Sequence, residues 1–570
     1  MHAPPAYLHG CTFSSPAGEI IARSAEEVLP AFRSLEERVA SGLHAAGFVS
    51  YEAAGALNGD LTTRAAGKLP LLWFGLYERR SESPFPPAGD PFDCTDWRTS
   101  LEAEEFGEAV GTIRDLIAAG DCYQVNFTMR QRFSFTGCPR SFFSALLESQ
   151  PTPYNCYLET GGFRILSASP ELFFALSGGV LTTRPMKGTA PRGRWFAEDQ
   201  ARKSSLRESP KEIAENLMIV DLLRNDMGMV SETGSVRVAS LFDVETHPTL
   251  HQMTSTIQSR LKGGVGPLEL FQALFPCGSV TGAPKRRSMQ IIADLEREPR
   301  GIYTGSLGYF SPGGEAKFSV AIRTALLDLE AGSGEIGIGS GITFDSAADD
   351  EYRECLSKGR FARNFGADFH LIESLLYQDG YFLLERHLER LSRSAAYFAF
   401  PLTAGAARGA LDEAAAGLDG KGAFKVRLTL FRDGRLGCEA APVQEAAPEA
   451  TACFATVAVD SNDPFLYHKT SRRDLYSREL AARPDVDEVI FENERGEVTE
   501  GANSNVIALI GGRRLTPPLC SGLLPGTFRE ELLANGSIEE RVLTREDLAQ
   551  AQELYLVNSV RKWRRVRLVI

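Results

Sequence analysis

The 570-residue sequence lacks the features of a secreted, membrane-bound or nucleic-acid-binding protein. Its ten cysteines are scattered and no two form a C-x-x-C pair, which argues against a zinc site and a disulfide framework. The N-terminus has no basic region followed by an apolar core, so we expect no signal peptide, and the longest apolar run is roughly half a membrane span. The net charge of −13 argues against general binding to nucleic acid or to an anionic membrane surface. We therefore expect a cytoplasmic globular protein.

The pattern of apolar residues predicts an α+β fold in two domains. Helical spacing predicts helices over 102–119, 210–225, 346–364 and 385–399. Strand-like segments are expected at 122–134, 154–160, 163–185, 303–310, 317–327 and 334–343. The composition changes near residues 366–368 without a long linker, so we predict a large domain over 1–366 and a smaller one over 367–570.

A lysine on a constrained turn is the most informative single residue. Residues 183–189 read T-R-P-M-K-G-T, with Lys187 between a proline that restricts φ and a glycine that permits unusual backbone angles. Such a turn could hold an amine at a fixed point, and a desolvated lysine loses its proton more easily and becomes a nucleophile. Taken alone, the turn is also typical of an exposed lysine with no chemical role.

Further chemical groups recur across 120–358 in a suggestive order. They are Glu171 after a proline, Glu215 in an otherwise apolar helix, the glycine-rich run 275–285, and Glu351, Glu354 and Lys358 on one helical face. Each has a simpler interpretation: Glu354 and Lys358 can form a solvated helical pair, Glu215 can be an exposed helix residue, and the glycine-rich run can be a structural turn.

In their order and their amino-acid sequence these clusters closely resemble motifs of the chorismate-binding enzymes. This family includes anthranilate, isochorismate and salicylate synthases and component I of aminodeoxychorismate synthase. The resemblance covers roughly residues 100–360, and residues 1–100 would complete the same large α+β domain. It implies chorismate as substrate and Mg²⁺, an ion that prefers oxygen ligands. It also implies Glu215 and Glu354 as metal ligands, with Glu351 acting beside them or through water.

The same resemblance assigns residues to the substrate. Tyr303 and Arg323 match positions that bind the enolpyruvyl carboxylate, and a guanidinium suits a carboxylate because it forms two parallel hydrogen bonds. The other matched substrate-binding residues are Ser279, Gly339, Gly341, Lys358 and His251. Packing in the core stays an open alternative for His251.

Glu171 and Lys187 take the chemical roles that the resemblance implies. Glu171 matches the general acid that helps the C4 hydroxyl to leave, so we predict that burial raises its pKa. The sequence P-M-K-G-T at residues 185–189 is similar to P-I-K-G-T of the enzymes that form aminodeoxychorismate. The enzymes that form anthranilate have alanine in place of the lysine. Lys187 would attack C2 of chorismate as the C4 hydroxyl departs, and ammonia would then attack C4 and expel the lysine.

The second domain has its own set of candidate residues. These residues could bind pyridoxal 5'-phosphate. Lys469 could form the Schiff base and Glu500 could pair with the pyridinium nitrogen. The phosphate could be held by Arg390 and the turn Gly526-Thr527. As an alternative, Lys469 can be a surface lysine and Arg390 a salt-bridge partner on a helix. The order of these residues resembles the fold-type IV enzymes, which include branched-chain aminotransferases, D-amino acid aminotransferases and aminodeoxychorismate lyase.

Aminodeoxychorismate lyase is the favoured member because it acts on the product expected from the first domain, releasing pyruvate and 4-aminobenzoate. Aminotransferases often have a tyrosine five residues after the lysine, where this chain has Asp474. That difference disfavours a plain transaminase. His468 and Arg473 are expected to line the substrate pocket.

The sequence thus predicts a bifunctional enzyme that makes 4-aminobenzoate for the folate pathway from chorismate and ammonia. No glutaminase domain with a G-x-C-x-G turn is found in the sequence, so ammonia would come from a separate glutamine amidotransferase subunit or from solution. Two alternatives stay open. One is a salicylate- or isochorismate-type synthase fused to a class IV transaminase, and the other is a regulatory chain that binds chorismate without turnover.

Overall fold

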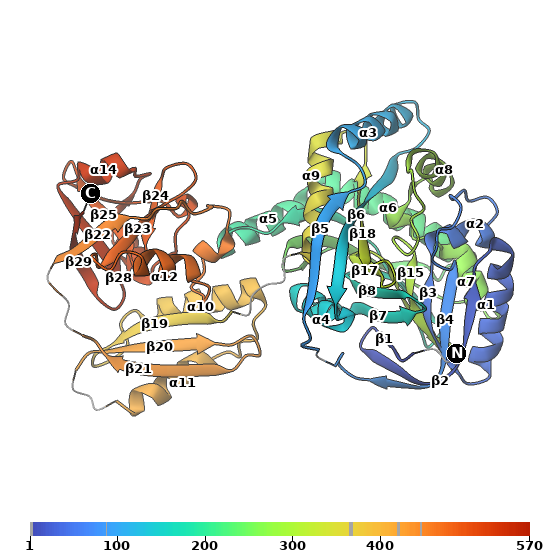
Figure 1. Cartoon of the computed structure of the whole chain (residues 1–570), viewed down its shortest axis with the longest axis horizontal. Coiled ribbons are helices and arrows are strands. Elements are labelled where there is room, and N and C mark those ends of the chain that lie inside the picture. The colour runs from blue at the N-terminus through green and yellow to red at the C-terminus, as the bar shows by residue number, and fades with distance from the viewer. Residues whose placement is uncertain are drawn as a thin grey trace. The chain divides into compact units, whose positions relative to one another are not determined.

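The computed structural model describes residues 4–86, 88–363, 369–418, 422–444, 447 and 449–569. The chain forms two compact units (Figure 1). Unit 1 contains Met1–Pro191 and Lys203–Gly366, and unit 2 contains Arg192–Arg202 and Ala367–Ile570. Both units mix helices and strands, which confirms the predicted α+β class. The predicted domain boundary between residues 366 and 367 lies outside the described residues.

Unit 1 is built on eighteen strands that form one hydrogen-bonded network within the described residues. The strands are β1 (Ala6–Leu8), β2 (Cys11–Ala22), β3 (His44–Val49), β4 (Leu72–Glu82), β5 (Phe92–Thr99), β6 (Gln124–Gly137), β7 (Tyr154–Thr160), β8 (Phe163–Ser169), β9 (Leu172–Ser177), β10 (Val180–Arg184), β11 (Met186–Pro191), β12 (Arg237–Thr246), β13 (Leu250–Arg260), β14 (Gly282–Ala283), β15 (Ser306–Ser311), β16 (Glu315–Val320), β17 (Thr324–Asp328) and β18 (Ser333–Ile342). Two antiparallel series leave β2. One runs through β1, β7, β8, β17, β18, β6 and β5, and the other through β4, β3, β15, β16, β9, β10 and β13.

Helices accompany this network. They are α1 (Ala25–Ala40), α2 (Ala54–Leu57), α3 (Ala103–Ala118), α4 (Pro139–Ser149), α6 (Pro210–Val230), α7 (Pro267–Leu274), α8 (Lys285–Leu295) and α9 (Ala348–Gly359), with the short 3₁₀ helices η1 (Tyr51–Ala53), η2 (Gly278–Val280) and η3 (Arg360–Ala362). The helix α5 (Phe196–Glu208) begins in unit 2, and its residues from Lys203 onward belong to unit 1. At the start of α6 the Ser209 hydroxyl accepts a hydrogen bond from the Glu212 N–H. The helix extends beyond its predicted end at 225 because Met227 and Val230 continue its buried stripe.

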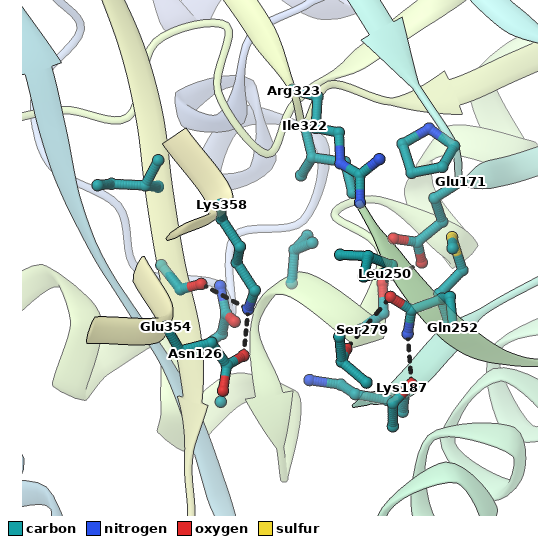
Figure 2. Close-up of a pocket in the computed structure, with 18 of the residues that line it drawn as sticks. Asn126, Glu171, Lys187, Leu250, Gln252, Ser279, Ile322, Arg323, Glu354 and Lys358 are labelled. Atoms are coloured by element: carbon teal, nitrogen blue, oxygen red, sulfur yellow. Dashed lines mark hydrogen bonds and ion pairs between the residues drawn. The ribbon is translucent and has the colours of Figure 1, made fainter. Parts of the chain in front are cut away.

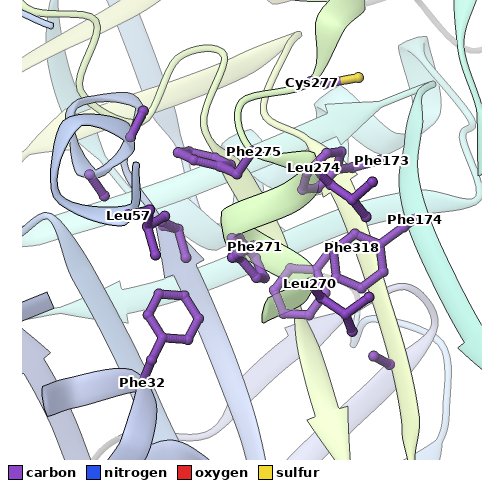
Figure 3. Close-up of a cluster of buried hydrophobic side chains, with 14 of the residues drawn as sticks. Phe32, Leu57, Phe173, Phe174, Leu270, Phe271, Leu274, Phe275, Cys277 and Phe318 are labelled. Carbon is purple, nitrogen blue, oxygen red and sulfur yellow. The ribbon is translucent and has the colours of Figure 1, made fainter. Parts of the chain in front are cut away.

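An aromatic cluster forms the core beneath α1 and α7 (Figure 3). Phe32 of α1 packs on Phe271 of α7 at 5.1 Å between ring centroids, and Phe271 contacts Phe318 of β16 at 5.2 Å. Phe174 of β9 stacks on Phe318 at 5.1 Å. Each fully buried phenylalanine contributes about 1.5–3 kcal/mol through burial. The cluster fixes β9, and Glu171 stands immediately before that strand.

Glycines on β18 make room beside the strand for the functional site. β18 pairs with β6 along its whole length, from Ser333 opposite Ser134 to Ile342 opposite Val125. A Cβ atom at Gly341 would lie 2.9 Å from Gln124 Nε2 and 3.1 Å from Lys187 Nζ. A side chain at this position would therefore displace the lysine amine.

Unit 2 contains two sheets in the part of the chain that the structure describes. Strands β19 (Leu371–Tyr377), β20 (Phe424–Leu430) and β21 (Leu436–Pro442) form the first, next to α10 (Leu384–Phe398) and α11 (Ala406–Ala416). The second has the order β24 (Val498–Gly501), β23 (Glu488–Glu492), β22 (Glu449–Phe454), β29 (Lys562–Leu568), β28 (Glu553–Asn558), β25 (Asn505–Ile510), β26 (Arg513–Thr516) and β27 (Glu539–Glu540). The other helices are α12 (Asp474–Ala481), α13 (Thr527–Ala534), α14 (Arg545–Ala549), η4 (Pro464–Leu466) and η5 (Leu519–Ser521).

Among the described residues, none of the helices combines the length and the apolar character needed to cross a membrane.

Candidate active sites

A cavity in unit 1 brings together most of the residues predicted to act on chorismate (Figure 2). Its wall includes Glu171, Lys187, Glu215, Ser279, Tyr303, Arg323, Gly339, Gly341, Glu351, Glu354 and Lys358. These residues come from strands, helices and loops that are far apart in sequence.

Lys187 reaches this cavity from a bulge in β11. The strand pairs with β13 at Met186 and again at Thr189, and its register shifts between the two. Asn216 Nδ2 donates to the Lys187 carbonyl at 3.2 Å, and Gln252 Nε2 donates to the carbonyl of Gly188 at 2.8 Å. Burial lowers the pKa of Lys187, as expected for a desolvated amine, although the nearby Glu215 carboxylate opposes the shift.

Glu171 lies in the same cavity and is only 2% exposed. Burial raises its pKa to about 7, which confirms the predicted direction of the shift. The Ser279 hydroxyl donates to Glu171 Oε1 at 2.6 Å, as Figure 2 shows, and acts against the shift by stabilising the carboxylate. Near neutral pH this carboxyl can therefore give up a proton.

Arg323 supplies positive charge that the protein does not neutralise. Within the described residues no aspartate or glutamate forms a salt bridge with it, and its guanidinium donates to the side-chain oxygen of Gln150. Burial lowers the pKa of Arg323 to about 10. Tyr303, 7% exposed, lines the same cavity. A partly buried guanidinium without a carboxylate partner suits an anionic ligand.

Lys358 and the carboxylates of α9 form the opposite wall. Lys358 Nζ lies 2.7 Å from Glu354 Oε1 and donates to the Gly339 carbonyl at 3.0 Å (Figure 2). Burial acts to lower the pKa of Lys358, but the Glu354 carboxylate outweighs it and the pKa is raised. The same ion pair lowers the pKa of Glu354. Glu351 Oε1 accepts a hydrogen bond from Ser346 at 2.6 Å.

The described wall of the cavity offers Mg²⁺ a pair of carboxylates, those of Glu215 and Glu354, instead of a cluster of three or more ligands. The described residues contain no group of three or more His, Cys, Asp or Glu side chains that could hold a metal ion. Mg²⁺ is commonly bound by one or two carboxylates, with water and substrate oxygens completing its shell. Glu215 and Glu354 line one cavity and supply oxygen donors of this kind, while Glu351 is already held by Ser346.

Gln124 is a residue of this site that the sequence did not reveal. It is fully buried on β6, and its Nε2 donates to Glu215 Oε2 at 3.1 Å. Its Oε1 has no hydrogen-bond partner among the described residues. No motif marks a glutamine in a strand, so only its position beside Glu215 and Lys187 identifies it.

His251 is placed differently from the other predicted residues. Leu250 and Gln252 line the cavity, but His251 is not among the described residues of its wall. The ring is fully buried and its Nδ1 lies 3.1 Å from the hydroxyl of Thr246. Since successive strand residues point to opposite faces, the geometry favours the alternative of packing in the core.

A second cavity, in unit 2, gathers the residues predicted for pyridoxal phosphate. Its wall includes Arg390, Lys469, Glu500, Gly526 and Thr527, and also Arg473. His468, expected in the substrate pocket, is not among the described residues of this wall, and it is buried with its Nδ1 2.9 Å from the hydroxyl of Ser394. Of the two residues predicted to line the substrate pocket, His468 and Arg473, the described wall of the cavity includes Arg473.

Burial shifts the ionisation of Lys469 and Glu500, the residues predicted to bind the cofactor. Burial lowers the pKa of Lys469 to about 7, helped by the positive charges of Arg390 and Arg473. Burial raises the pKa of Glu500 to about 7. Tyr476 Oη donates to Glu500 Oε1 at 3.0 Å, and Leu524 N donates to Oε2 at 3.2 Å. An amine and a carboxyl that are each about half ionised near neutral pH thus share one cavity.

The predicted phosphate site has a buried ionic network that the sequence did not reveal. Arg390 Nε and Nη2 donate to Glu373 at 2.9 and 2.7 Å. His387 Nδ1 lies 2.6 Å from the same carboxylate, and its Nε2 lies 3.1 Å from the hydroxyl of Thr527. Although burial opposes it, Arg390 and His387 lower the pKa of Glu373 to about 2. Thr527 begins α13, where helix N–H groups attract phosphate, so the residues present fit pyridoxal phosphate.

The fold of unit 1 agrees with comparisons to known proteins. The family described as chorismate binding enzyme matches residues 7–364. This chain therefore belongs to the chorismate-binding enzymes. The family described as amino-transferase class IV matches residues 371–569, which covers most of unit 2 but not Arg192–Arg202.

The relatives include aminodeoxychorismate synthases and an anthranilate synthase. The chain is 44% identical over 256 residues to aminodeoxychorismate synthase of Streptomyces pristinaespiralis, covering 45% of this chain and 35% of that protein. It is 41% identical to aminodeoxychorismate synthase component 1 of Bacillus subtilis, covering 44% and 53%. Anthranilate synthase component I from Streptococcus pneumoniae has a similar structure, with a TM-score of 0.56 at 27% identity over 63% of this chain and 92% of that one. The chain thus spans about half or less of the length of these two curated relatives.

Proposed function

We propose that the chain converts chorismate and ammonia to 4-amino-4-deoxychorismate in unit 1, and that unit 2 eliminates pyruvate from this product to give 4-aminobenzoate. The observation that carries the proposal is the desolvated Lys187 amine in one cavity with a Glu171 carboxyl whose pKa is about 7. A nucleophile and an acid with these ionisations are what displacement of a hydroxyl group requires.

The first reaction can be assigned to residues of the unit 1 cavity. The Arg323 guanidinium and the Tyr303 hydroxyl would bind the enolpyruvyl carboxylate. Lys187 Nζ would form a bond to C2 as the two conjugated ring double bonds shift and the C4 hydroxyl leaves as water with the Glu171 proton. Ammonia would then bond to C4, both double bonds would shift back, and the C2–nitrogen bond to Lys187 would break. The new C4 ammonium group would return a proton to Glu171. The net change exchanges a hydroxyl group for an amino group.

Mg²⁺, when bound, would neutralise the ring carboxylate of chorismate. Glu215 and Glu354 would hold it, with Glu351 nearby on the same helical face. Gln124 would keep Glu215 oriented through its 3.1 Å hydrogen bond.

Amination is favoured over the water-adding isochorismate- or salicylate-type reaction by the relatives, which include aminodeoxychorismate synthase component 1 of Bacillus subtilis. Gln124 adds a buried hydrogen-bond acceptor next to Glu215, since its Oε1 has no partner among the described residues.

The second reaction can be assigned to the cavity of unit 2. Pyridoxal phosphate, when bound, would accept the electron pair left behind when a proton leaves carbon. Lys469 would take that proton from the ring carbon that bears nitrogen, since its pKa of about 7 leaves much of the amine uncharged. Glu500 would pair with the pyridinium nitrogen, and Arg390, Gly526 and Thr527 would hold the phosphate. Arg473 would face a substrate carboxylate.

The proposal extends to partners and location. We infer a domain division after residue 366, a cytoplasmic enzyme of the folate pathway, and a separate glutamine amidotransferase as the source of ammonia. The component 1 relatives are consistent with such a second component.

Mass spectrometry of the products tests this function. The full chain is incubated with chorismate, ammonium and Mg²⁺, with and without pyridoxal phosphate. We expect 4-aminobenzoate with the cofactor and aminodeoxychorismate without it. Anthranilate, isochorismate or salicylate as the main product would contradict the proposal, and absence of turnover with retained chorismate binding would support the regulatory alternative.

A further inference from the structure

A segment from the first part of the chain, Arg192–Arg202, belongs to compact unit 2. In sequence it lies inside the 7–364 range of the chorismate-binding family and begins shortly after the Lys187 turn. We refer to it as the 192–202 segment.

The segment has a rigid internal structure. Arg192 Nε and Nη2 donate to the two carboxylate oxygens of Asp199 at 2.7 and 3.0 Å, and the two side chains are 7% and 2% exposed. The Gly193 N–H donates to Asp199 Oδ1 at 2.8 Å. A two-point ion pair with this little exposure holds the loop in one shape.

Tyr397 and Tyr467 bind the segment to the rest of unit 2. The Arg192 guanidinium lies 4.1 Å from the centre of the Tyr397 ring and donates to the Tyr397 carbonyl at 2.9 Å. In return the Tyr397 hydroxyl donates to the Gly193 carbonyl at 2.7 Å. The Trp195 and Tyr467 rings lie 5.1 Å apart. These contacts combine directional hydrogen bonds with packing of aromatic rings.

The residues that the segment contacts are neighbours of Lys469 in sequence or pack against those neighbours. Tyr467 and His468 precede the lysine, and the His468 ring lies 4.3 Å from that of Tyr397. Ser394, on the same helix as Arg390 and one turn from it, contacts His468 Nδ1 at 2.9 Å. Burial lowers the pKa of His468 to about 3, and the Arg192 charge acts in the same direction.

We infer that the 192–202 segment is a positioning element for the unit 2 reaction, with Trp195 and Arg192 holding the Tyr467–Lys469 backbone and the end of α10. Substitutions in this segment therefore impair the second reaction although they lie in the chorismate-binding part of the sequence. The inference rests on the function proposed for Lys469.

The test compares Trp195→Ala with Trp195→Phe, which keeps an aromatic ring, and with Gln200→Ala, an exposed position in the same segment. The full-length chain is treated with hydroxylamine to release any bound pyridoxal phosphate and then acetylated over a range of pH. Peptide mass spectrometry follows Lys469, and Lys187 in the same digest reports on unit 1. This readout needs no turnover.

For Trp195→Ala we expect the midpoint of Lys469 acetylation to rise by roughly 1 pH unit or more above the wild-type midpoint, because the Tyr467–Lys469 backbone loses its support and water reaches the amine. The Lys187 midpoint stays as in the wild type. In the coupled assay the ratio of aminodeoxychorismate to 4-aminobenzoate rises by about 10-fold or more. Trp195→Phe should show little of either change because it keeps an aromatic ring against Tyr467. Gln200→Ala should show neither change.

An unchanged Lys469 midpoint and product ratio in Trp195→Ala would overturn the inference, and so would equal shifts at Lys469 and Lys187, which indicate general loosening. Tyr397→Phe gives a second measurement because it removes only the hydrogen bond to Gly193, and a Lys469 shift smaller than that of Trp195→Ala is expected. If Lys469→Ala still forms 4-aminobenzoate, the proposed function fails instead, whatever the labelling shows.

Discussion

Replacing Gly341 with alanine tests the geometry around Lys187 with a single methyl group. The new Cβ would lie 3.1 Å from Lys187 Nζ and 2.9 Å from Gln124 Nε2, both tighter than an ordinary van der Waals contact. The lysine side chain is flexible, so the amine moves aside by a few tenths of an ångström or more. Gly341 is one of the residues placed at the cavity wall, and its backbone does not require glycine.

The chemistry should suffer far more than the stability. A displacement of about 1 Å at a reacting group can cost roughly 100-fold in rate, so we expect kcat for aminodeoxychorismate formation to fall about 10- to 100-fold. The free energy of unfolding should change by less than about 1.5 kcal/mol, because the contacts can relax through side chains.

The assay measures aminodeoxychorismate formation from chorismate and ammonium, together with chemical unfolding of the same samples. Gly111→Ala is the matched control, since a Cβ there meets no atom within 4 Å. It should leave kcat unchanged and, being in a helix, stabilise the chain by at most about 1 kcal/mol. Normal kcat in Gly341→Ala would refute the placement of the Lys187 amine beside this glycine.

Three further predictions follow from the ionisable residues. Glu171→Gln should lower kcat of the first reaction by roughly 100- to 10,000-fold. The wild-type rate should fall as pH rises through about 7, where Glu171 loses its proton. If the rate of Glu171→Gln falls over the same pH range, the role of Glu171 as the acid is contradicted. The same raised pKa means that the native state binds the Glu171 proton more tightly, so its contribution to unfolding free energy falls between about pH 4.5 and 7, as urea titrations at several pH values would show. Glu373→Gln should destabilise unit 2 by about 3 kcal/mol because it strands the buried Arg390, whereas Glu389→Gln, which breaks an exposed pair, should cost less than about 1 kcal/mol in the same unfolding assay.

The sequence predicted the residues that carry recognisable motifs. Lys187, Glu171 and the α9 face could be identified because their neighbours form long family-like stretches, and the structure places them around one cavity. Helical spacing also located α3 and α10 within a residue or two, since both bury a regular stripe. The end of α6 was wrong because the periodicity continues to Val230.

Residues that act through tertiary contacts could not be predicted. Gln124 and Glu373 lie in strands with no motif, and their partners Glu215 and Arg390 come from distant parts of the chain. The 192–202 segment reads as an ordinary polar loop and helix, so its association with Tyr397 depends on the fold. For His251 the sequence left both the pocket and the core open, because a motif match does not tell which face of a strand a side chain occupies. Its position outside the described wall of the cavity favours the core.

The most direct test of the central claim measures aminodeoxychorismate by mass spectrometry in two full-length variants, Lys469→Ala and the double variant Lys187→Ala/Lys469→Ala. Both receive chorismate, ammonium, Mg²⁺ and pyridoxal phosphate. The account predicts that Lys469→Ala accumulates aminodeoxychorismate with little 4-aminobenzoate, and that adding Lys187→Ala lowers the accumulation by at least about 100-fold. Equal accumulation in the two variants would contradict a nucleophilic Lys187.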